Sequence, residues 1–457
     1  MAENLFSDFE SVSSKQWKQQ IQFELKGADY NETLVWNSPE DIKVRPFYHA
    51  DDAVKPFDVS RKENGFTICQ HIFVHDLDKS IFRANDSIKR GAERIRFSIE
   101  NEQTDVTKLL ESIALENISV YFDLPFLSID FVKQINQIAA QKNARIFCLI
   151  DPIGQLAKDG NWFSGGENFQ ILNTLSEETR NISFLSINAG LYQNAGANIV
   201  QQIAYTLAHA NEYFNRVPNL KKPIVLEVAV GTNYFFEIAK LRALRVLFNI
   251  IAKEYGHDFD CHILATPTKR NKTLYDYNVN MLRTTTECMS AILGGADAVQ
   301  HLPYDVLYHK SNEFGERISR NQLLVLKHES YFDKVNNPAD GSYYIENLTQ
   351  QLAEKALVLF KDIEANDGFL VKLGEGTIQR KISESAEKEQ ELFDSGKEIL
   401  LGTNKYPNKN DRMAHDLELF PFVKTKPRKT LITPIIEKRL SEKNELQRLE
   451  QENSSST

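Results

Sequence analysis

Long apolar runs are absent from the 457-residue sequence, and no stretch approaches the roughly 20 apolar residues that a helix needs to cross a bilayer. The N-terminus, MAENLFSDFESVSSKQWKQQ, is acidic and polar early and lacks a charged segment followed by an apolar one, so a secretory signal is not expected. We therefore predict a cytoplasmic protein with no membrane contact.

An excess of positive charge is also missing. The chain has 54 Lys and Arg against 63 Asp and Glu, a net charge of −9, which argues against a nucleic-acid or anionic-membrane surface. Basic residues gather in KTKPRKT, residues 424–430, where a solvated linker is the simpler interpretation. No nucleic-acid partner is predicted.

Paired cysteines and the common catalytic motifs are lacking too. No CxxC spacing occurs, so a metal or redox pair is not expected, and buried reduced thiols are predicted at Cys69, Cys148, Cys261 and Cys288. The sequence contains no HExxH, P-loop, GxGxxG or GxSxG pattern. This excludes the simple zinc-protease, nucleotide-binding and serine-hydrolase interpretations.

What the sequence does contain is a regular alternation of strand and helix patterns. Eight short β-rich runs begin at residues 68, 93, 118, 144, 184, 223, 261 and 296. Helix-period apolar residues lie between them, as at Phe131, Ile135 and Ile138. Such alternation predicts a parallel sheet, and the count of eight favours an α/β fold of the closed (β/α)8 TIM-barrel type.

The parts flanking the barrel complete a predicted three-part organisation. Residues 1–60 form an N-terminal docking arm with a helix around Trp17 that ends near Gly27, residues 61–405 form the barrel with C-terminal helices, and residues 406–457 form a polar, frayed tail. Residues 279–293 read as the helix before the eighth strand, with Gly294-Gly295 as its left-handed stop. Arg283 and the threonines after it are expected to face a packing or partner surface.

Catalytic or binding residues of a barrel enzyme are expected in the loops that follow the strands. The candidates at those positions are Asp123, Asp151, Asn188, Glu227, Thr266, Thr268 and His301. Asp151 either takes part in chemistry or caps the next turn. His301 is either a ligand or a hydrogen-bonded core imidazole.

Several long segments together resemble the methylmalonyl-CoA mutase family, in the family order and over about residues 15 to 407. They are KQWKQQIQFELKGADYNETLVW, IKVRPFYHADD, FFEIAKLRALRVLF, VNMLRTTTECMSAILGGADAVQHLPYD, RISRNQLLVLKHES, NNPADGSYYIENLTQQLAEKA and ILLGTNKYP. The resemblance implies a (β/α)8 barrel through which catalytic chains thread coenzyme A, and a separate C-terminal domain that holds adenosylcobalamin. That implication agrees with the eight strands.

The sequence departs from the catalytic pattern of that family at the pocket. Catalytic chains carry Gly-Tyr-His-Met-Gln-Glu-Ala-Gly-Ala after the fifth strand, whereas this chain has AGLYQNAGA, residues 189–197. Aligned on the shared Gln193, the histidine becomes Leu191 and the tyrosine becomes Gly190. Residues 56–70 also lack the tyrosine of the Thr-Met-Tyr-Arg stretch. No catalytic residue is therefore expected in this degenerate pocket.

A holder for the cofactor is not recognised either. DCHILA, residues 260–265, resembles the start of the cobalamin motif Asp-x-His-x-x-Gly but has Ala265 in place of glycine, so His262 is expected in the core. No cofactor-binding or metal-binding residue is predicted. RIFCLI and IVLEVAV offer large apolar residues to both faces, which predicts a packed barrel without a coenzyme channel.

The resemblance implies the small, non-catalytic subunit of a heterodimeric methylmalonyl-CoA mutase. Its large partner would bind adenosylcobalamin and interconvert (R)-methylmalonyl-CoA and succinyl-CoA. The arm around Trp17 and the helices at 311–366 are the expected partner-facing surfaces. Two alternatives stay open: the substrate-domain chain of a split acyl-CoA mutase with a separate cobalamin-domain subunit, and a regulatory or scaffold protein that engages the family's repair chaperone.

Overall fold

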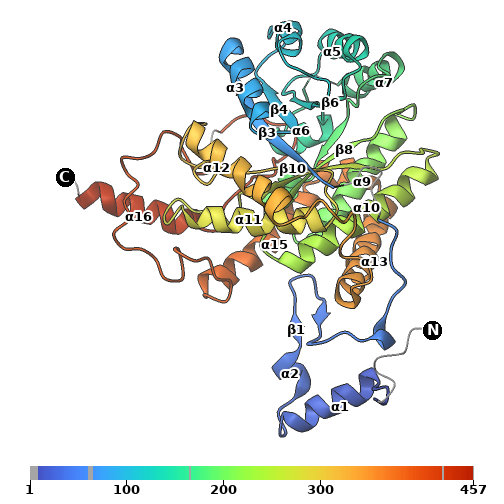
Figure 1. The fold of residues 1–457 in the computed structure, drawn as a ribbon, viewed down its shortest axis with the longest axis vertical. Coiled ribbons are helices and arrows are strands. Elements are labelled where there is room, and N and C mark those ends of the chain that lie inside the picture. The colour runs from blue at the N-terminus through green and yellow to red at the C-terminus, as the bar shows by residue number, and fades with distance from the viewer. Residues whose placement is uncertain (1–8, 60–64, 164–165, 425–426, 456–457) are drawn as a thin grey trace.

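The computed structural model describes residues 9–59, 65–163, 166–424 and 427–455. Figure 1 shows a barrel surrounded by helices, an N-terminal arm that extends away from it, and a group of C-terminal helices and loops beside it. Residues 1–8 and 60 of the predicted arm, and residues 425–426 of the basic segment, lie outside the described residues. No helix of the described chain is long and apolar enough to cross a membrane.

Eight parallel strands form the barrel, and each coincides with one of the eight predicted runs. They are β3 (Thr67–Val74), β4 (Arg94–Ile99), β5 (Ser119–Asp123), β6 (Ile146–Leu149), β7 (Ser186–Asn188), β8 (Val225–Val230), β9 (His262–Pro267) and β10 (Ala298–Gln300). Their order is β6-β5-β4-β3-β10-β9-β8-β7. Between β6 and β7 the Cys148 amide donates to the Ser183 carbonyl at 2.7 Å. The predicted TIM barrel is therefore confirmed.

Helices cover the outside of the barrel because one face of each is apolar. In chain order they are α3 (Leu77–Lys89), α4 (Val106–Glu111), α5 (Ile129–Lys142), α6 (Pro152–Asp159), α7 (Asn168–Glu178), α8 (Gly190–Asn194), α9 (Ile199–Arg216), α10 (Tyr234–Glu254) and α11 (Val279–Leu293). The predicted stripe of Phe131, Ile135 and Ile138 on α5 is buried in the main core. Local periodicity was enough to orient this helix. All four cysteines are buried free thiols, as predicted.

Helix α11 has the bounds expected from its pattern, and Gly295 makes the turn into β10 with a φ of +92°. Arg283 is buried on this helix and donates to the Thr273 hydroxyl at 2.9 Å and to the Leu401 carbonyl at 2.6 Å. Its packing role is therefore confirmed. Burial lowers the pKa of Arg283 to about 10.

A buried ion pair ties α10 to the amino-terminal end of the barrel. The Arg245 guanidinium donates to the Asp297 carboxylate at 2.8 Å, and the Ile263 amide donates to the same oxygen at 2.7 Å. Burial raises the pKa of Asp297, but the charge of Arg245 outweighs this effect and the pKa falls to about 2. Asp297 is therefore ionised at neutral pH.

Asp297→Asn is expected to lower the free energy of unfolding by about 2 kcal/mol at pH 7, from the shift of the pKa. Because the folded-state pKa lies below the unfolded value, this stabilisation is full above about pH 5 and is lost as the pH falls toward 2. Urea unfolding of both proteins from pH 7 to pH 3 measures it. The exposed Asp258→Asn is the matched control, and a penalty that does not shrink with falling pH would contradict the assignment.

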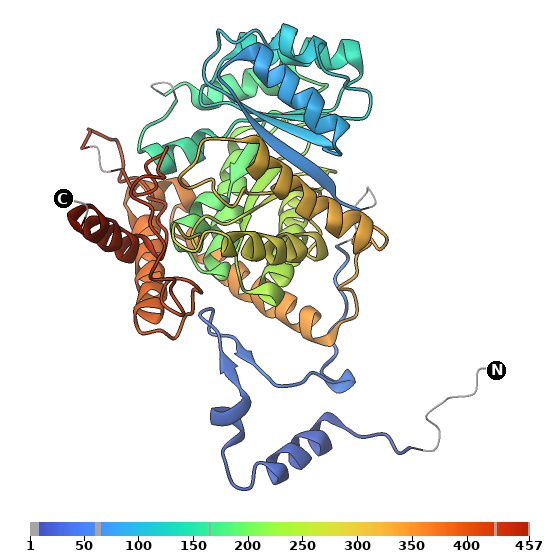
Figure 2. The same ribbon diagram turned by 60° about the vertical axis from the view of Figure 1, so that its left-hand side comes forward.

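The N-terminal arm contains α1 (Ser14–Glu24), α2 (Tyr30–Leu34), β1 (Trp36–Asn37), β2 (Lys43–Val44) and the short helix η1 (Ala50–Asp52). Helix α1 begins at the Ser13 capping box and has no buried residue, and both Figure 1 and Figure 2 show it standing away from the barrel. The β1–β2 turn instead contacts the body of the protein, where the Ile199 amide donates to the buried Glu40 carboxylate at 3.4 Å. The predicted helix is confirmed.

The C-terminal part contains α12 (Glu313–Leu324), a π-helical turn η2 (Val325–Glu329), α13 (Tyr343–Ala365), α14 (Gly368–Gly374), α15 (Thr377–Asp394) and α16 (Glu442–Ser455). The helices predicted within residues 311–366 are confirmed as α12 and α13. The prediction of a frayed C-terminal end is wrong, because residues 442–455 form α16. The division at residues 60 and 405 stays a prediction.

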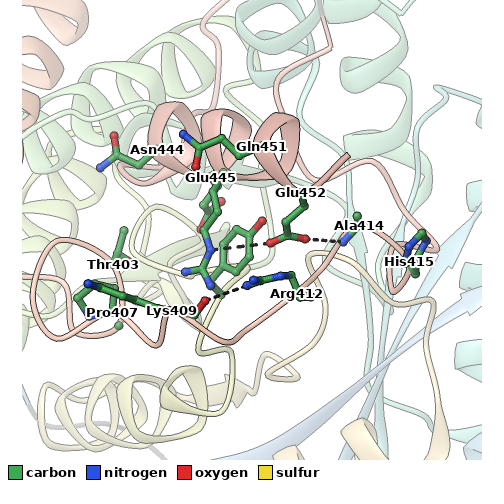
Figure 3. Close-up of a pocket in the computed structure, with 13 residues that line it drawn as sticks. Thr403, Pro407, Lys409, Arg412, Ala414, His415, Asn444, Glu445, Gln451 and Glu452 are labelled. Carbon is green, nitrogen blue, oxygen red and sulfur yellow. Dashed lines mark hydrogen bonds and ion pairs between the residues drawn. The ribbon is translucent and has the colours of Figure 1, made fainter. Parts of the chain in front are cut away.

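Helix α16 is ordered because partners far away in the chain satisfy its polar residues. The buried Glu445 accepts a hydrogen bond from the Leu274 amide at 2.8 Å and lies 2.6 Å from Arg439. Figure 3 shows Glu452 reaching the loop at Ala414, whose amide donates to it at 3.1 Å. Between α16 and this loop lies a cleft of about 800 Å³. A polar composition alone did not reveal these contacts.

Candidate functional site

A charged cluster lies inside the barrel, between the middle of β4 and β8 and the carboxyl ends of β5 and β10. The Arg96 guanidinium on β4 lies 2.6 Å from the Glu227 carboxylate on β8 and 3.2 Å from the Asp123 carboxylate on β5. The same guanidinium donates to the Gln300 side chain on β10 at 3.4 Å. Four strands thus contribute to one ionic network. Two of the predicted candidates, Asp123 and Glu227, belong to it, although Glu227 lies within β8 and not in the loop after it.

The two carboxylates of this cluster titrate differently. Burial favours the neutral form of Asp123, but the charge of Arg96 and a hydrogen bond from Ser98 outweigh it and lower its pKa. Burial raises the pKa of Glu227, and Arg96 offsets only part of that effect. The Ser98 hydroxyl also lies 2.9 Å from the His71 ring, whose pKa burial and Arg96 lower to about 4. Glu227 is therefore the carboxylate that protonates more readily.

Deeper in the barrel the filling is aromatic. The His262 ring lies against Phe147 with centroids 4.8 Å apart, and its Nε2 is 2.7 Å from the Tyr121 hydroxyl. Burial lowers the pKa of His262 to about 3, which keeps the ring neutral. The prediction that His262 is a core residue is confirmed.

The expectation of apolar residues on both faces of the strands is wrong in one respect. Leu226, Val228 and Val230 of β8 point outward into the helix-covered core, whereas Glu227 points inward to Arg96. The barrel interior is filled at its mouth by charge instead of by large aliphatic side chains. The absence of a coenzyme channel stays a prediction.

The stretch aligned with the catalytic pattern of the family forms α8 at the end of β7. Leu191 is buried, and its amide donates to the Asn188 side chain at 3.2 Å. A Cβ added to Gly190 would lie 3.3 Å from the same Asn188 oxygen and 3.5 Å from Ala229. Gly190 therefore has little room for a side chain, and neither residue presents a polar side chain to the mouth.

Gln193 belongs to a buried polar cluster behind α8. The Lys240 ammonium donates to the Gln193 and Gln202 side chains, each at 3.0 Å, and to the Ala229 carbonyl at 2.8 Å. Lys240 also forms an ion pair with Glu237. Gln193 thus helps to satisfy a buried cation that joins α8, α9 and α10.

Asp151 is linked to α8 through His209 and Tyr192. Its carboxylate caps α6 by accepting from the Gly154 amide at 2.8 Å and lies 2.9 Å from His209 Nε2. The other ring nitrogen of His209 is 2.9 Å from the Tyr192 hydroxyl. Burial raises the pKa of Asp151, but His209 outweighs it and the net pKa is lowered. Of the two interpretations of Asp151, the capping role is the one observed.

The remaining candidates make other hydrogen bonds, although Asn188 on β7 lies in register with Glu227 on β8. Asn188 donates its amide to Asp151 at 2.8 Å, and Thr268 donates to the Asn194 side chain at 2.8 Å. Thr266 on β9 lies in register with Ala229 on β8. His301 is buried with Nδ1 2.9 Å from the Leu302 carbonyl, as the core interpretation predicts.

Arg96 is the residue of the mouth that the sequence reasoning missed. In RIRFSI every second residue faces the same side of the strand, so Arg94, Arg96 and Ser98 were readable as one polar inward face. His209 and Lys240 carried no such signal, because helix periodicity places them among apolar residues.

The sequence of this chain matches the family model described as Methylmalonyl-CoA mutase over residues 95–451. The chain belongs to the methylmalonyl-CoA mutase family. It is 31% identical over 443 residues to the methylmalonyl-CoA mutase small subunit of Porphyromonas gingivalis, an alignment that covers 89% of this chain and 71% of the relative. The family prediction is therefore confirmed.

Other members of the methylmalonyl-CoA mutase family extend the comparison. The small subunit of Streptomyces virginiae is 25% identical, over 90% of this chain and 73% of its own length. The methylmalonyl-CoA mutase of Rhizobium meliloti is 27% identical, over 92% of this chain and 66% of that protein. The chain thus covers a larger share of the two small subunits than of that mutase.

The family is cobalamin-dependent, and the described residues of this chain do not fit a cobalt ligand. His262 stands in the partial cobalamin motif, yet its ring is buried between Tyr121 and Phe147 inside the barrel. In the described part of the chain no group of three or more His, Cys, Asp or Glu side chains could hold a metal ion.

Proposed function

We propose that this chain is the small, non-catalytic subunit of a heterodimeric methylmalonyl-CoA mutase. The observation that carries the proposal is the structure around α8, where a buried leucine, Leu191, stands in place of the histidine of catalytic chains. A leucine side chain has no group that could hydrogen-bond a thioester carbonyl. The charged cluster around Arg96 supports the same interpretation, because it occupies the mouth with internal ion pairs.

The large partner would bind adenosylcobalamin and carry out the isomerisation of methylmalonyl-CoA and succinyl-CoA in the cytoplasm. This chain would support it through surfaces that its own fold leaves uncovered. Helix α1 has no buried residue, while Trp17 and Phe23 on it are exposed. We propose the arm as the first docking surface and the helices between residues 311 and 366 as a second.

Co-expression with a candidate large subunit tests the proposal. The expected result is a 1:1 complex by mass whose mutase activity requires adenosylcobalamin and falls when this chain is left out. Should the chain remain alone and convert substrate when given only a separate cobalamin-domain protein, it would be the catalytic half of a split mutase. A chain that neither associates nor converts substrate would leave a regulatory or scaffold role.

Leu191→Ala is expected to leave the activity of the purified complex within about twofold of the wild type, because a residue outside the reacting site does not affect transition-state stabilisation. The stability of this chain should fall by about 3 kcal/mol, since the variant leaves a cavity in the core. Activity assays and thermal unfolding of the same preparation separate the two effects. A loss of activity in a complex that stays intact would make Leu191 part of a working pocket.

A further inference from the structure

A cavity of about 330 Å³ lies between the barrel loops and the C-terminal segment. Four stretches of chain line it: the end of α8 at Asn194, the loop after β9 at Lys269, the loop after β10 at Val306 and Leu307, and parts of the segment 419–442. This volume is at the lower end of the range of small-molecule sites. The cavity is separate from the charged cluster in the barrel and from the cleft shown in Figure 3.

The floor of the cavity is apolar. Val306, Leu307 and Phe422 line it together with Phe420, whose side chain is 59% exposed. The Phe420 and Phe422 rings meet edge to face with centroids 5.5 Å apart. Exposed aromatic rings beside a cavity provide apolar area that a ligand can bury.

The rim of the cavity carries three lysines, Lys269, Lys424 and Lys438. Each is exposed. Among the described residues, none of the three ammonium groups forms a hydrogen bond or an ion pair. With a net charge of −9 on the whole chain, this concentration of unpaired positive charge is a local feature.

The other charged groups that line the cavity already have partners. Arg270 lies 2.5 Å from Glu389, and Arg439 lies 2.6 Å from Glu445. Glu437 accepts a hydrogen bond from the Asn194 side chain at 3.0 Å. Glu442 accepts one from the Arg439 amide at 3.2 Å. The lysines are therefore the charges available to a ligand.

We propose that this cavity binds a small organic anion that joins a short apolar body to a phosphate or carboxylate group. The apolar floor buries the body, and the lysines on the rim bind the anionic head by charge-assisted hydrogen bonds. Because the lining comes from four separate stretches, the bound anion links the C-terminal segment to the barrel loops. Binding to the folded state alone then stabilises the full chain.

Titration calorimetry of the full chain with four hexyl compounds tests the chemistry of the site. Hexyl phosphate and hexanoate carry the anionic head, whereas hexanol is neutral and hexylamine is cationic. Hexyl phosphate is expected to bind about tenfold more tightly than hexanol, since exposed ionic contacts each contribute modestly, and to raise the melting temperature. The comparison of the two anions identifies the preferred head group. Equal binding of all four compounds would overturn the proposal.

Charge-reversal variants locate the site. Lys269→Glu/Lys424→Glu/Lys438→Glu is expected to abolish the preference for the anions. Lys89→Glu/Lys253→Glu/Lys361→Glu changes the net charge by the same amount at exposed positions outside the cavity lining and should keep the preference. Phe420→Ala, at an exposed floor position, should weaken hexyl phosphate and hexanol alike. Unchanged binding of hexyl phosphate to the first variant would show that the anion binds elsewhere.

Discussion

Replacing Arg96 with methionine is expected to lower the free energy of unfolding by about 3 kcal/mol at pH 7, the range found when one partner of a buried ion pair is removed. Methionine keeps much of the length and the apolar stem of arginine, so packing changes little. What it removes is the only counter-charge within 3.2 Å of both Asp123 and Glu227 among the described residues. The Glu227 side chain is only 12% exposed, so little water can replace its lost partner, whereas the Asp123 side chain is 42% exposed and stays partly hydrated.

Urea unfolding at several pH values measures this effect. Loss of Arg96 raises the folded-state pKa of Glu227 further above its unfolded value, so the variant regains stability relative to the wild type as the pH falls. The double variant Arg96→Met/Glu227→Gln should recover most of the loss at pH 7, because it also removes the unpaired charge. A single variant within about 0.5 kcal/mol of the wild type would mean that the cluster is well solvated.

Deletion of residues 1–26 is expected to weaken association with the large subunit by about 100-fold, while the barrel keeps its stability. A few clustered aromatic side chains typically account for a change in affinity of this size at a protein–protein interface. Within the described chain, α1 forms its hydrogen bonds and ring contacts with its own arm: the Ser14 amide donates to Asp51 at 2.8 Å, and Trp17 meets Phe47 with ring centroids 6.3 Å apart. The barrel therefore loses no buried contact when the helix is removed.

Point substitutions make the same test without shortening the chain. Trp17 is 49% exposed and Phe23 is 80% exposed, so Trp17→Ala/Phe23→Ala should weaken association in the same direction and leave the melting temperature unchanged. Phe82→Ala, at a similarly exposed ring on α3, is the matched control. Dissociation constants from sedimentation of labelled protein provide the comparison. Equal affinity of the deleted chain and the intact chain would remove the arm from the interface.

The sequence by itself determined the eight strands, the helices between them and the family of the chain. These features depend on neighbouring residues: apolar periodicity sets the conformation of a segment, and Ser128 or Asp151 can cap the helix that directly follows it. The family was readable for a similar reason, because long segments such as FFEIAKLRALRVLF retain their order along the chain.

Tertiary structure decided which side chains meet. Arg96 and Glu227 are 131 positions apart, and only closure of the barrel brings them within 2.6 Å. The order of α16 likewise depends on the amides of Leu274 and Ala414, which donate hydrogen bonds to the helix only in the folded chain. Local pattern fixes a backbone conformation, whereas a buried charge is stable only next to its partner. For this reason the strands of the mouth could be predicted, while its charged filling and the lysine-rimmed cavity could not.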